Sequence, residues 1–215
     1  MQLVLVRHGV TEGADGVCMG HADLPLADRG RPALARLATA WRDDAAAGRS
    51  TVAAPTTLVA SDLARTRASA DILGEAFGLA PALDARLREM HFGVWEGRPW
   101  SALEAEDSER LGRWMAGWAT EAAPDGESFP DVAARTAAWL ADLRAGPTPG
   151  GPVLAVAHSG SIRALLCALM GWPLAAAFRV RVDHARATGV RVAPADDPRG
   201  SELLFLNADR VPCRP

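Results

Sequence analysis

Short hydrophobic runs, each followed by polar or glycine residues, are the clearest pattern along this chain. Residues 3–6 (Leu-Val-Leu-Val) and 153–157 (Val-Leu-Ala-Val-Ala) are hydrophobic throughout, which is typical of strands buried on both faces of a sheet. A third run at residues 58–61 predicts another short strand, and Leu83 begins a further one. The hydrophobic pattern therefore predicts several short strands spread along the whole chain.

Near the end of the chain the pattern changes to a pair of strands. Residues 189–193 and 203–206 alternate or run hydrophobic. The segment between them, residues 194–200, contains two prolines and a glycine, which is typical of a long turn between strands.

Segments with helical periodicity lie between the predicted strands. Hydrophobic residues recur every three or four positions in four segments, namely residues 28–48 (capped by Asp28 and ended by Gly48), 63–77, 127–143 and 162–170. Strands that alternate with helices predict an α/β fold. We expect a three-layer sandwich, in which a mostly parallel central sheet carries helices on both faces.

Residues 98–130 differ from the rest of the chain. Four of the seven tryptophans fall within residues 95–118, and the segment looks helical until Pro124-Asp125-Gly126. We interpret 98–130 as a small helical cap inserted into a single domain that spans residues 1–215. Most of its tryptophans are expected to fill core, because large aromatic side chains are usually packed inside.

Composition excludes several classes of function. The net charge is −3 and every basic residue is arginine, so no basic surface for nucleic acid is expected. No hydrophobic run is long enough to span a bilayer, and the first residues lack the features of a signal peptide. The three cysteines, Cys18, Cys167 and Cys213, are scattered, which predicts a cytoplasmic protein with no disulfide framework and no metal or cofactor site.

Two of the buried strands end in a histidine followed closely by glycine. Arg7-His8-Gly9 follows the first strand and His158-Ser159-Gly160 follows residues 153–157. The carboxyl ends of parallel strands are where open α/β sheets bind ligands. A neutral imidazole can form a covalent bond to a phosphoryl group. The Arg7 guanidinium beside it can bind two phosphate oxygens at once. His8 is therefore our candidate nucleophile.

Other residues complete a candidate site for phosphoryl transfer. Arg65, just after the strand at 58–61, is expected to bind the same phosphoryl group, and His158 to donate to its oxygens. Glu89 is the candidate general acid and base. We expect four further residues to contact the substrate, with the Gly160 N–H at the helix start facing the anion: Thr11, Gly20, Ser159 and Gly160.

The remaining histidines are expected to be structural. We expect this of His21, His91 and His184, because a single histidine is more often structural than catalytic.

Together these motifs resemble the signature of the histidine phosphatase superfamily, whose fold is that of cofactor-dependent phosphoglycerate mutase. The resemblance rests on residues 7–11 (Arg-His-Gly-x-Thr), 61–66, 87–97 and 156–163, and covers essentially the whole chain. It implies a phosphohistidine at position 8, phosphate contacts from Arg7, Arg65 and His158, and proton transfer by Glu89.

Residues 17–26 and 95–100 are similar to the α-ribazole phosphatase branch of that superfamily. This similarity implies a metal-independent phosphatase acting on a small phosphorylated metabolite, α-ribazole 5′-phosphate. It leaves open a phosphoglycerate mutase, a broad-specificity sugar-phosphate phosphatase, and a phosphate-binding module without turnover. Val10 replaces the family's usual acid, which is one reason to consider the last alternative. A homodimer is also possible.

Overall fold

A computed structural model describes residues 1–146, 149–194, 197 and 199–214. Within these residues the chain forms a six-stranded sheet with the strand order β3-β2-β4-β1-β5-β6. Its strands are β1 (Gln2–Arg7), β2 (Thr57–Ala60), β3 (Ala82–Leu83), β4 (Val153–Ala157), β5 (Ala187–Arg191) and β6 (Glu202–Ala208). The turn predicted at 194–200 lies partly outside the described residues.

The sheet is mostly parallel. β1 pairs with β4, β4 with β2 and β2 with β3, all in parallel. β5 and β6 form the predicted pair of strands. β5 pairs antiparallel with β1 on the side opposite β4, and β6 pairs antiparallel with β5. Because β5 runs opposite to β1, the beginning of β5 lies beside the end of β1, with Ala187 opposite Val6.

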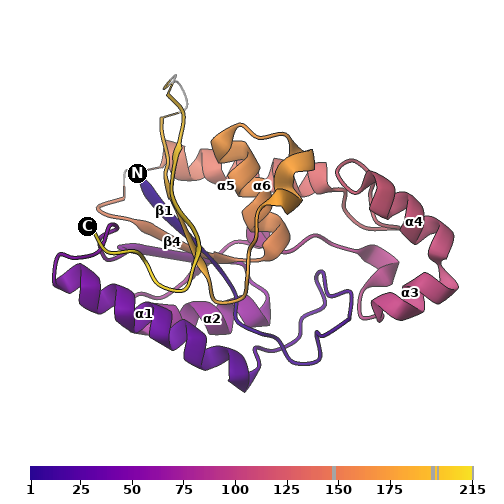
Figure 1. The fold of residues 1–215 in the computed structure, drawn as a ribbon, viewed down its shortest axis with the longest axis horizontal. Coiled ribbons are helices and arrows are strands. Elements are labelled where there is room, and N and C mark those ends of the chain that lie inside the picture. Colours follow the sequence, from indigo (N-terminus) through magenta and orange to yellow (C-terminus); the bar gives the residue numbers. More distant parts are fainter. Residues whose placement is uncertain (147–148, 195–196, 198, 215) are drawn as a thin grey trace.

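Side chains alternate between the two faces of the sheet and build two separate hydrophobic clusters. In β1, Leu3 and Leu5 pack toward α5 (Phe129–Ala145) and α6 (Ser159–Met170). Val4 and Val6 pack toward α1 (Arg31–Ala46) and α2 (Ala64–Glu75). Figure 1 shows α1 and α2 below the sheet and α5 and α6 above it, so the predicted three-layer α/β architecture is confirmed.

Helix boundaries differ from the predicted ones where polar residues begin or end a helix. Asp28 does not cap α1, because residues 28–30 form a 3₁₀ turn and the helix begins at Arg31 with Pro32 in its first turn. The Asp28 carboxylate instead accepts a hydrogen bond from Arg31 Nε at 3.2 Å. α6 begins at Ser159, three residues before the hydrophobic pattern starts. Its first turn is small and polar, so hydrophobic periodicity could not reveal it.

Two short helices stand apart from the sheet. α3 (Trp100–Glu106) and α4 (Ser108–Gly117) lie beyond the ends of α5 and α6 in Figure 1. They cover a third hydrophobic cluster, in which Trp95 and Leu103 meet Phe129 of α5 and Ala164 of α6. Both helices fall within residues 98–130, the segment interpreted as a cap.

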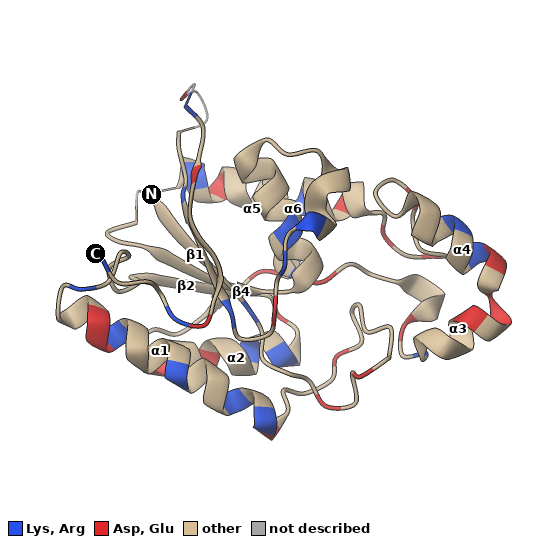
Figure 2. Ribbon diagram, in the orientation of Figure 1, with Lys and Arg blue, Asp and Glu red and all other residues tan. Residues whose placement is uncertain are grey.

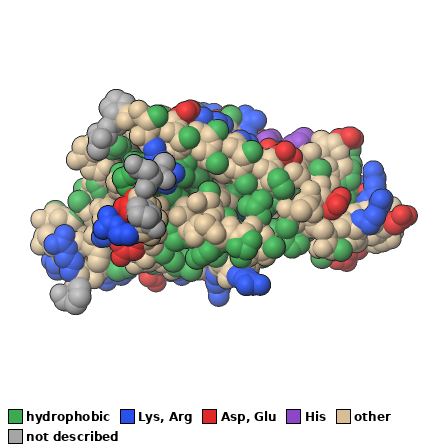
Figure 3. Space-filling model, turned by 90° about the horizontal axis from the view of Figure 1, so that it is seen from above, with side chains coloured by type: hydrophobic (Ala, Val, Ile, Leu, Met, Phe, Trp, Pro, Cys, Tyr) green, Lys and Arg blue, Asp and Glu red, His purple; other side chains and the backbone are tan. Residues whose placement is uncertain are grey.

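Charge is kept away from the centre of the sheet. β2 and β4 carry no charged residue, and β1 carries only Arg7 at its end, as Figure 2 shows. Seen from above in Figure 3, histidine and basic side chains lie next to each other at the surface, beside a broad hydrophobic area. No helix in the described part of the chain is long and hydrophobic enough to cross a membrane.

Candidate active site

The two histidines that end buried strands meet at one edge of the sheet. In the parallel pairing of β1 with β4, Arg7 lies opposite Ala157, so the following residues, His8 and His158, emerge side by side. The His8 N–H donates to the Ala157 carbonyl at 3.1 Å, and the two ring centroids are 4.9 Å apart. The strand register therefore brings together two imidazoles that are 150 positions apart in the sequence.

The His8 ring is buried and held in one orientation. Only 5% of the residue is exposed, and Nδ1 lies 2.7 Å from the Gly9 carbonyl oxygen. Because a carbonyl can only accept a hydrogen bond, Nδ1 carries the proton and Nε2 keeps its lone pair. Burial, together with the positive charges of Arg65 and Arg7, holds the pKa of His8 well below its usual value. The ring is therefore neutral and can act as a nucleophile through Nε2.

His158 is fully buried at the start of α6. Its Nε2 lies 2.9 Å from the Ser61 hydroxyl oxygen at the end of β2, and its pKa is also held well below the usual value by burial and by the neighbouring His8 and Arg65. Nδ1 is buried and has no hydrogen-bond partner among the described residues. A buried polar atom without a partner is costly, so this nitrogen points to a ligand at the site.

Hydrogen bonds to backbone carbonyls hold the Arg7 and Arg65 side chains in place. Arg7 Nη1 donates to the Val182 carbonyl at 2.8 Å, while its Nε is buried without a partner in the described structure. Arg65, in the first turn of α2, donates to the carbonyls of Ala22 at 2.8 Å and Gly20 at 2.7 Å. Both guanidinium groups keep their charge free for an anion.

Gly20 contributes to the site through its backbone. Its φ angle is +42°, and a side chain there would meet the Glu96 carboxylate and the Met90 carbonyl. Its carbonyl holds Arg65, so the structure gives Gly20 a role in positioning this arginine.

The Glu89 carboxylate lies against the first turn of α6. Oε1 accepts from the Gly160 N–H at 2.9 Å and from the Met90 N–H at 3.0 Å. A Cβ atom at position 160 would collide with this carboxylate, so glycine is needed for the close approach. The Gly160 N–H, which was expected to face the anion, is therefore directed to Glu89 in this structure.

A cavity of about 510 Å³ opens beside Glu89 and Gly160. It lies under the cap, and its lining includes six aromatic side chains: Phe92, Trp100, Trp114, Trp118, Phe129 and Phe178. Arg163 also lines it, with its guanidinium 4.8 Å from the centre of the Phe178 ring and hydrogen-bonded to the Ser159 hydroxyl. Ser159 thus lies in the cavity wall as a partner of Arg163.

Thr11, the fourth expected substrate contact, lies elsewhere. It is 2% exposed and forms an isolated bridge with Leu26, and it is not among the described residues that line the cavity.

Sequence reasoning missed the proximity of His184 to the nucleophile. Its ring centroid lies 5.0 Å from that of His8, and its Nδ1 lies 3.0 Å from the His8 carbonyl oxygen. His184 precedes β5, whose start lies beside the end of β1. Only the antiparallel pairing of β5 with β1 could have indicated this contact, and the sequence pattern alone does not reveal that pairing. The ring centroids of His21 and His91 are 4.9 Å apart, and His21 Nε2 lies 2.8 Å from the Glu89 carbonyl oxygen.

The arrangement suits transfer of a phosphoryl group. Two imidazoles with lowered pKa values and two arginines lie at the end of the sheet, and the Glu89 carboxylate lines the cavity. Within the described residues, no group of three or more histidine, cysteine, aspartate or glutamate side chains could hold a metal ion.

Comparison with known proteins agrees with this geometry. A model of the histidine phosphatase superfamily (branch 1) matches residues 3–199. A probable phosphoglycerate mutase GpmB from Shigella boydii is 32% identical over 191 residues, which cover 88% of this chain and 84% of the relative.

Solved structures show the same fold. The crystal structure of the α-ribazole phosphatase from Shigella flexneri aligns over 100% of both chains, with a TM-score of 0.86 and 27% identity. A mycobacterial glucosyl-3-phosphoglycerate phosphatase covers 96% of this chain and 98% of its own, with a TM-score of 0.81 and 32% identity.

Proposed function

Because the chain belongs to the histidine phosphatase superfamily (branch 1) and is a phosphatase, we propose that it hydrolyses phosphomonoesters through a phosphohistidine at His8, without a metal ion. The observation that carries this proposal is the buried pair of imidazoles, His8 and His158, whose pKa values are held well below the usual value by burial and by the nearby Arg65 and Arg7. A basic nitrogen, Nε2 of His8, is thus available among positive groups that attract a phosphate.

In the first step, His8 Nε2 attacks phosphorus and the bond from phosphorus to the ester oxygen breaks. Arg7, Arg65 and His158 hold the phosphoryl oxygens, whose charge is spread over three positions in the transition state. The protonated Glu89 carboxyl gives its proton to the departing oxygen, which leaves as an alcohol.

In the second step, water attacks the phosphorus of phospho-His8. Glu89, now a carboxylate, takes a proton from the water, and the bond between phosphorus and Nε2 breaks. Inorganic phosphate leaves, and both His8 and Glu89 return to their starting protonation states.

The proposed substrate is α-ribazole 5′-phosphate, a small phosphorylated metabolite. The fold similarity to α-ribazole phosphatases from Shigella flexneri and Escherichia coli, at 27% identity, supports it. So does the aromatic cavity beside Glu89, because this ester carries a benzimidazole ring that aromatic side chains can stack against.

A phosphoglycerate ester is the second candidate. It is favoured by the 32% identity to a probable phosphoglycerate mutase and to a glucosyl-3-phosphoglycerate phosphatase. Arg163, in the cavity wall, offers a cation for the carboxylate of such a substrate.

The test is phosphate release by the wild-type protein and the His8→Ala variant, both in EDTA. The substrates are α-ribazole 5′-phosphate, 3-phosphoglycerate, fructose bisphosphates and p-nitrophenyl phosphate. Selective release from the ribazole ester that depends on His8 is expected. Near-wild-type activity of His8→Ala would refute the phosphohistidine, and preference for 3-phosphoglycerate, or its isomerisation, would favour the second candidate.

A further inference from the structure

We propose that Arg135, on the second turn of α5, is a positioning residue that fixes Glu89 for proton transfer. The proposal rests on the proposed function, since it assigns a partner to the acid of that reaction. Arg135 itself contacts Glu89 at its backbone carbonyl.

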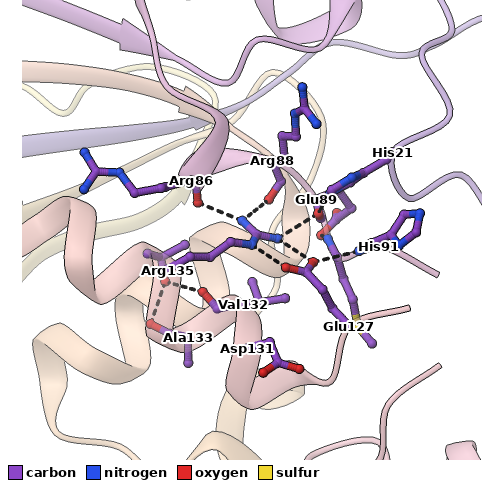
Figure 4. Close-up of polar contacts among 12 residues, drawn as sticks. His21, Arg86, Arg88, Glu89, His91, Glu127, Asp131, Val132, Ala133 and Arg135 are labelled. Atoms are coloured by element: carbon purple, nitrogen blue, oxygen red, sulfur yellow. Dashed lines mark hydrogen bonds and ion pairs between the residues drawn. The ribbon is translucent and has the colours of Figure 1, made fainter. Parts of the chain in front are cut away.

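The Arg135 guanidinium binds the backbone of the segment that carries Glu89. Nη1 donates to the carbonyls of Arg86 at 2.7 Å and Arg88 at 2.8 Å, and Nη2 donates to the carbonyl of Glu89 itself at 2.8 Å. Figure 4 shows these bonds converging on one guanidinium. Residues 88–92 have no helix or strand, so Arg135 supplies hydrogen bonds that regular structure would otherwise provide.

Glu127 fixes Arg135 in turn. Nε and Nη2 of Arg135 donate to the two oxygens of this carboxylate at 2.7 and 2.9 Å, and Glu127 also accepts from the His91 N–H at 2.9 Å. The side chains of Arg135 and Glu127 are only 17% and 23% exposed. An ion pair made through two hydrogen bonds fixes the orientation of the guanidinium as well as its distance. Its Nη1 and Nη2 groups therefore point toward the backbone carbonyls described above.

The backbone and the carboxylate of Glu89 are therefore held by different groups. His21 Nε2, 2.8 Å from the Glu89 carbonyl, assists Arg135 at the backbone. Gly160 and Met90 hold the carboxylate. A carboxyl that must reach both a leaving oxygen and a water tolerates little displacement, so loosening its backbone should impair proton transfer first.

The test uses Arg135→Gln, with Arg144→Gln as the matched control on the same helix, because Arg144 is exposed in the last turn of α5. The measured quantity is kcat/KM for p-nitrophenyl phosphate, whose leaving group departs as a stable anion, and for ethyl phosphate, whose leaving oxygen needs a proton. In Arg135→Gln the loss for ethyl phosphate should exceed that for p-nitrophenyl phosphate by about ten-fold or more. A purely structural role would lower both values equally.

A second measurement needs no turnover. Amide hydrogen exchange at Gly160 and Met90 reports the hydrogen bonds to the Glu89 carboxylate, and Arg135→Gln should speed it by about ten-fold or more while the β4 amides remain protected. Arg135→Lys keeps the positive charge but loses the planar guanidinium, and it should behave like Arg135→Gln. If the glutamine variant does not fold, the lysine variant is measured in its place.

Retained protection of both amides, or an equal loss for the two esters, would overturn the proposal. A failure of the proposed function looks different: the wild-type protein would then release no phosphate in a His8-dependent manner, whatever the exchange data show.

Discussion

At the scale of single residues, the site depends on keeping two histidines neutral and one glutamate in place. His8 and His158 are neutral because burial and two nearby arginines oppose a further positive charge. The Glu89 carboxylate accepts hydrogen bonds from the Gly160 and Met90 N–H groups, which fix its position. Two predictions follow from these contacts.

Glu89→Gln should lower kcat by about 10²–10⁴-fold, the range for loss of a general acid or base. Glutamine has the same shape and its oxygen can still accept from Gly160 and Met90, so the thermal midpoint should stay near that of the wild type. Steady-state kinetics and a thermal melt check both statements. A loss of only two- or three-fold would assign the proton to another group.

Stability should fall as the pH drops below about 6.5, the unperturbed histidine pKa. In the unfolded chain the histidines take up protons there, whereas the buried His8 and His158, with lowered pKa values, do not. Each such histidine adds a slope of up to about 1.4 kcal/mol per pH unit below that point. His158→Gln should therefore flatten the fall in unfolding free energy between pH 7 and pH 5, measured with urea; an unchanged slope would contradict this.

At the scale of elements, the first turn of α6 contacts the candidate catalytic residues Glu89 and His158. Its three residues Ser159, Gly160 and Ser161 are small and polar, and each has a specific partner. Ser159 binds Arg163, Gly160 binds Glu89, and the Ser161 hydroxyl accepts from the His158 N–H at 3.1 Å. The turn thus positions the acid and the second histidine together.

Gly160→Ala tests whether the first turn of α6 can change without loss of folding but with an effect on Glu89. Alanine favours a helix interior by up to about 1 kcal/mol over glycine, but its Cβ would collide with the Glu89 carboxylate. We expect a folded protein whose kcat is lower than that of the wild type. Kinetics together with a urea titration would check this, and full activity would show that the carboxylate can move aside at no cost.

At the scale of the whole molecule, His8 and His158 lie at the end of the sheet, and the cavity beside Glu89 is lined by residues of α3 and α4 and by residues outside them. Glu89 and Gly160 line this cavity. Under the proposed function, chemistry at phosphorus and recognition of the leaving group are carried by different parts of the chain.

Phe178→Ala should reveal this division. The side chain lies in the cavity wall, its residue is 60% exposed, and it contacts Trp118 with ring centroids 4.5 Å apart. Its loss should lower kcat/KM for α-ribazole 5′-phosphate by roughly three- to ten-fold, the worth of one aromatic contact, and leave kcat/KM for ethyl phosphate unchanged. Trp172→Ala, an exposed aromatic outside the described cavity lining, is the control, and an equal effect in both variants would refute the assignment.

Much of the fold could be predicted because hydrophobic patterns report burial directly. The runs at residues 3–6 and 153–157 are buried strands, and the α/β layering follows from their alternation with helices. Helix starts were predicted less well, since Asp28 has the chemistry of a cap but pairs with Arg31. Whether a polar residue caps a helix depends on local geometry that the sequence does not display.

The sequence by itself determined which chemical groups are available to the site. It showed histidines after two buried strands, arginines beside them, and a glutamate in a matching motif. Only the tertiary structure decided which of these groups meet, because contacts depend on strand order and register. Register placed His8 beside His158, the antiparallel β5 brought His184 to the same edge, and packing of α5 behind residues 88–92 put Arg135 against the backbone of Glu89.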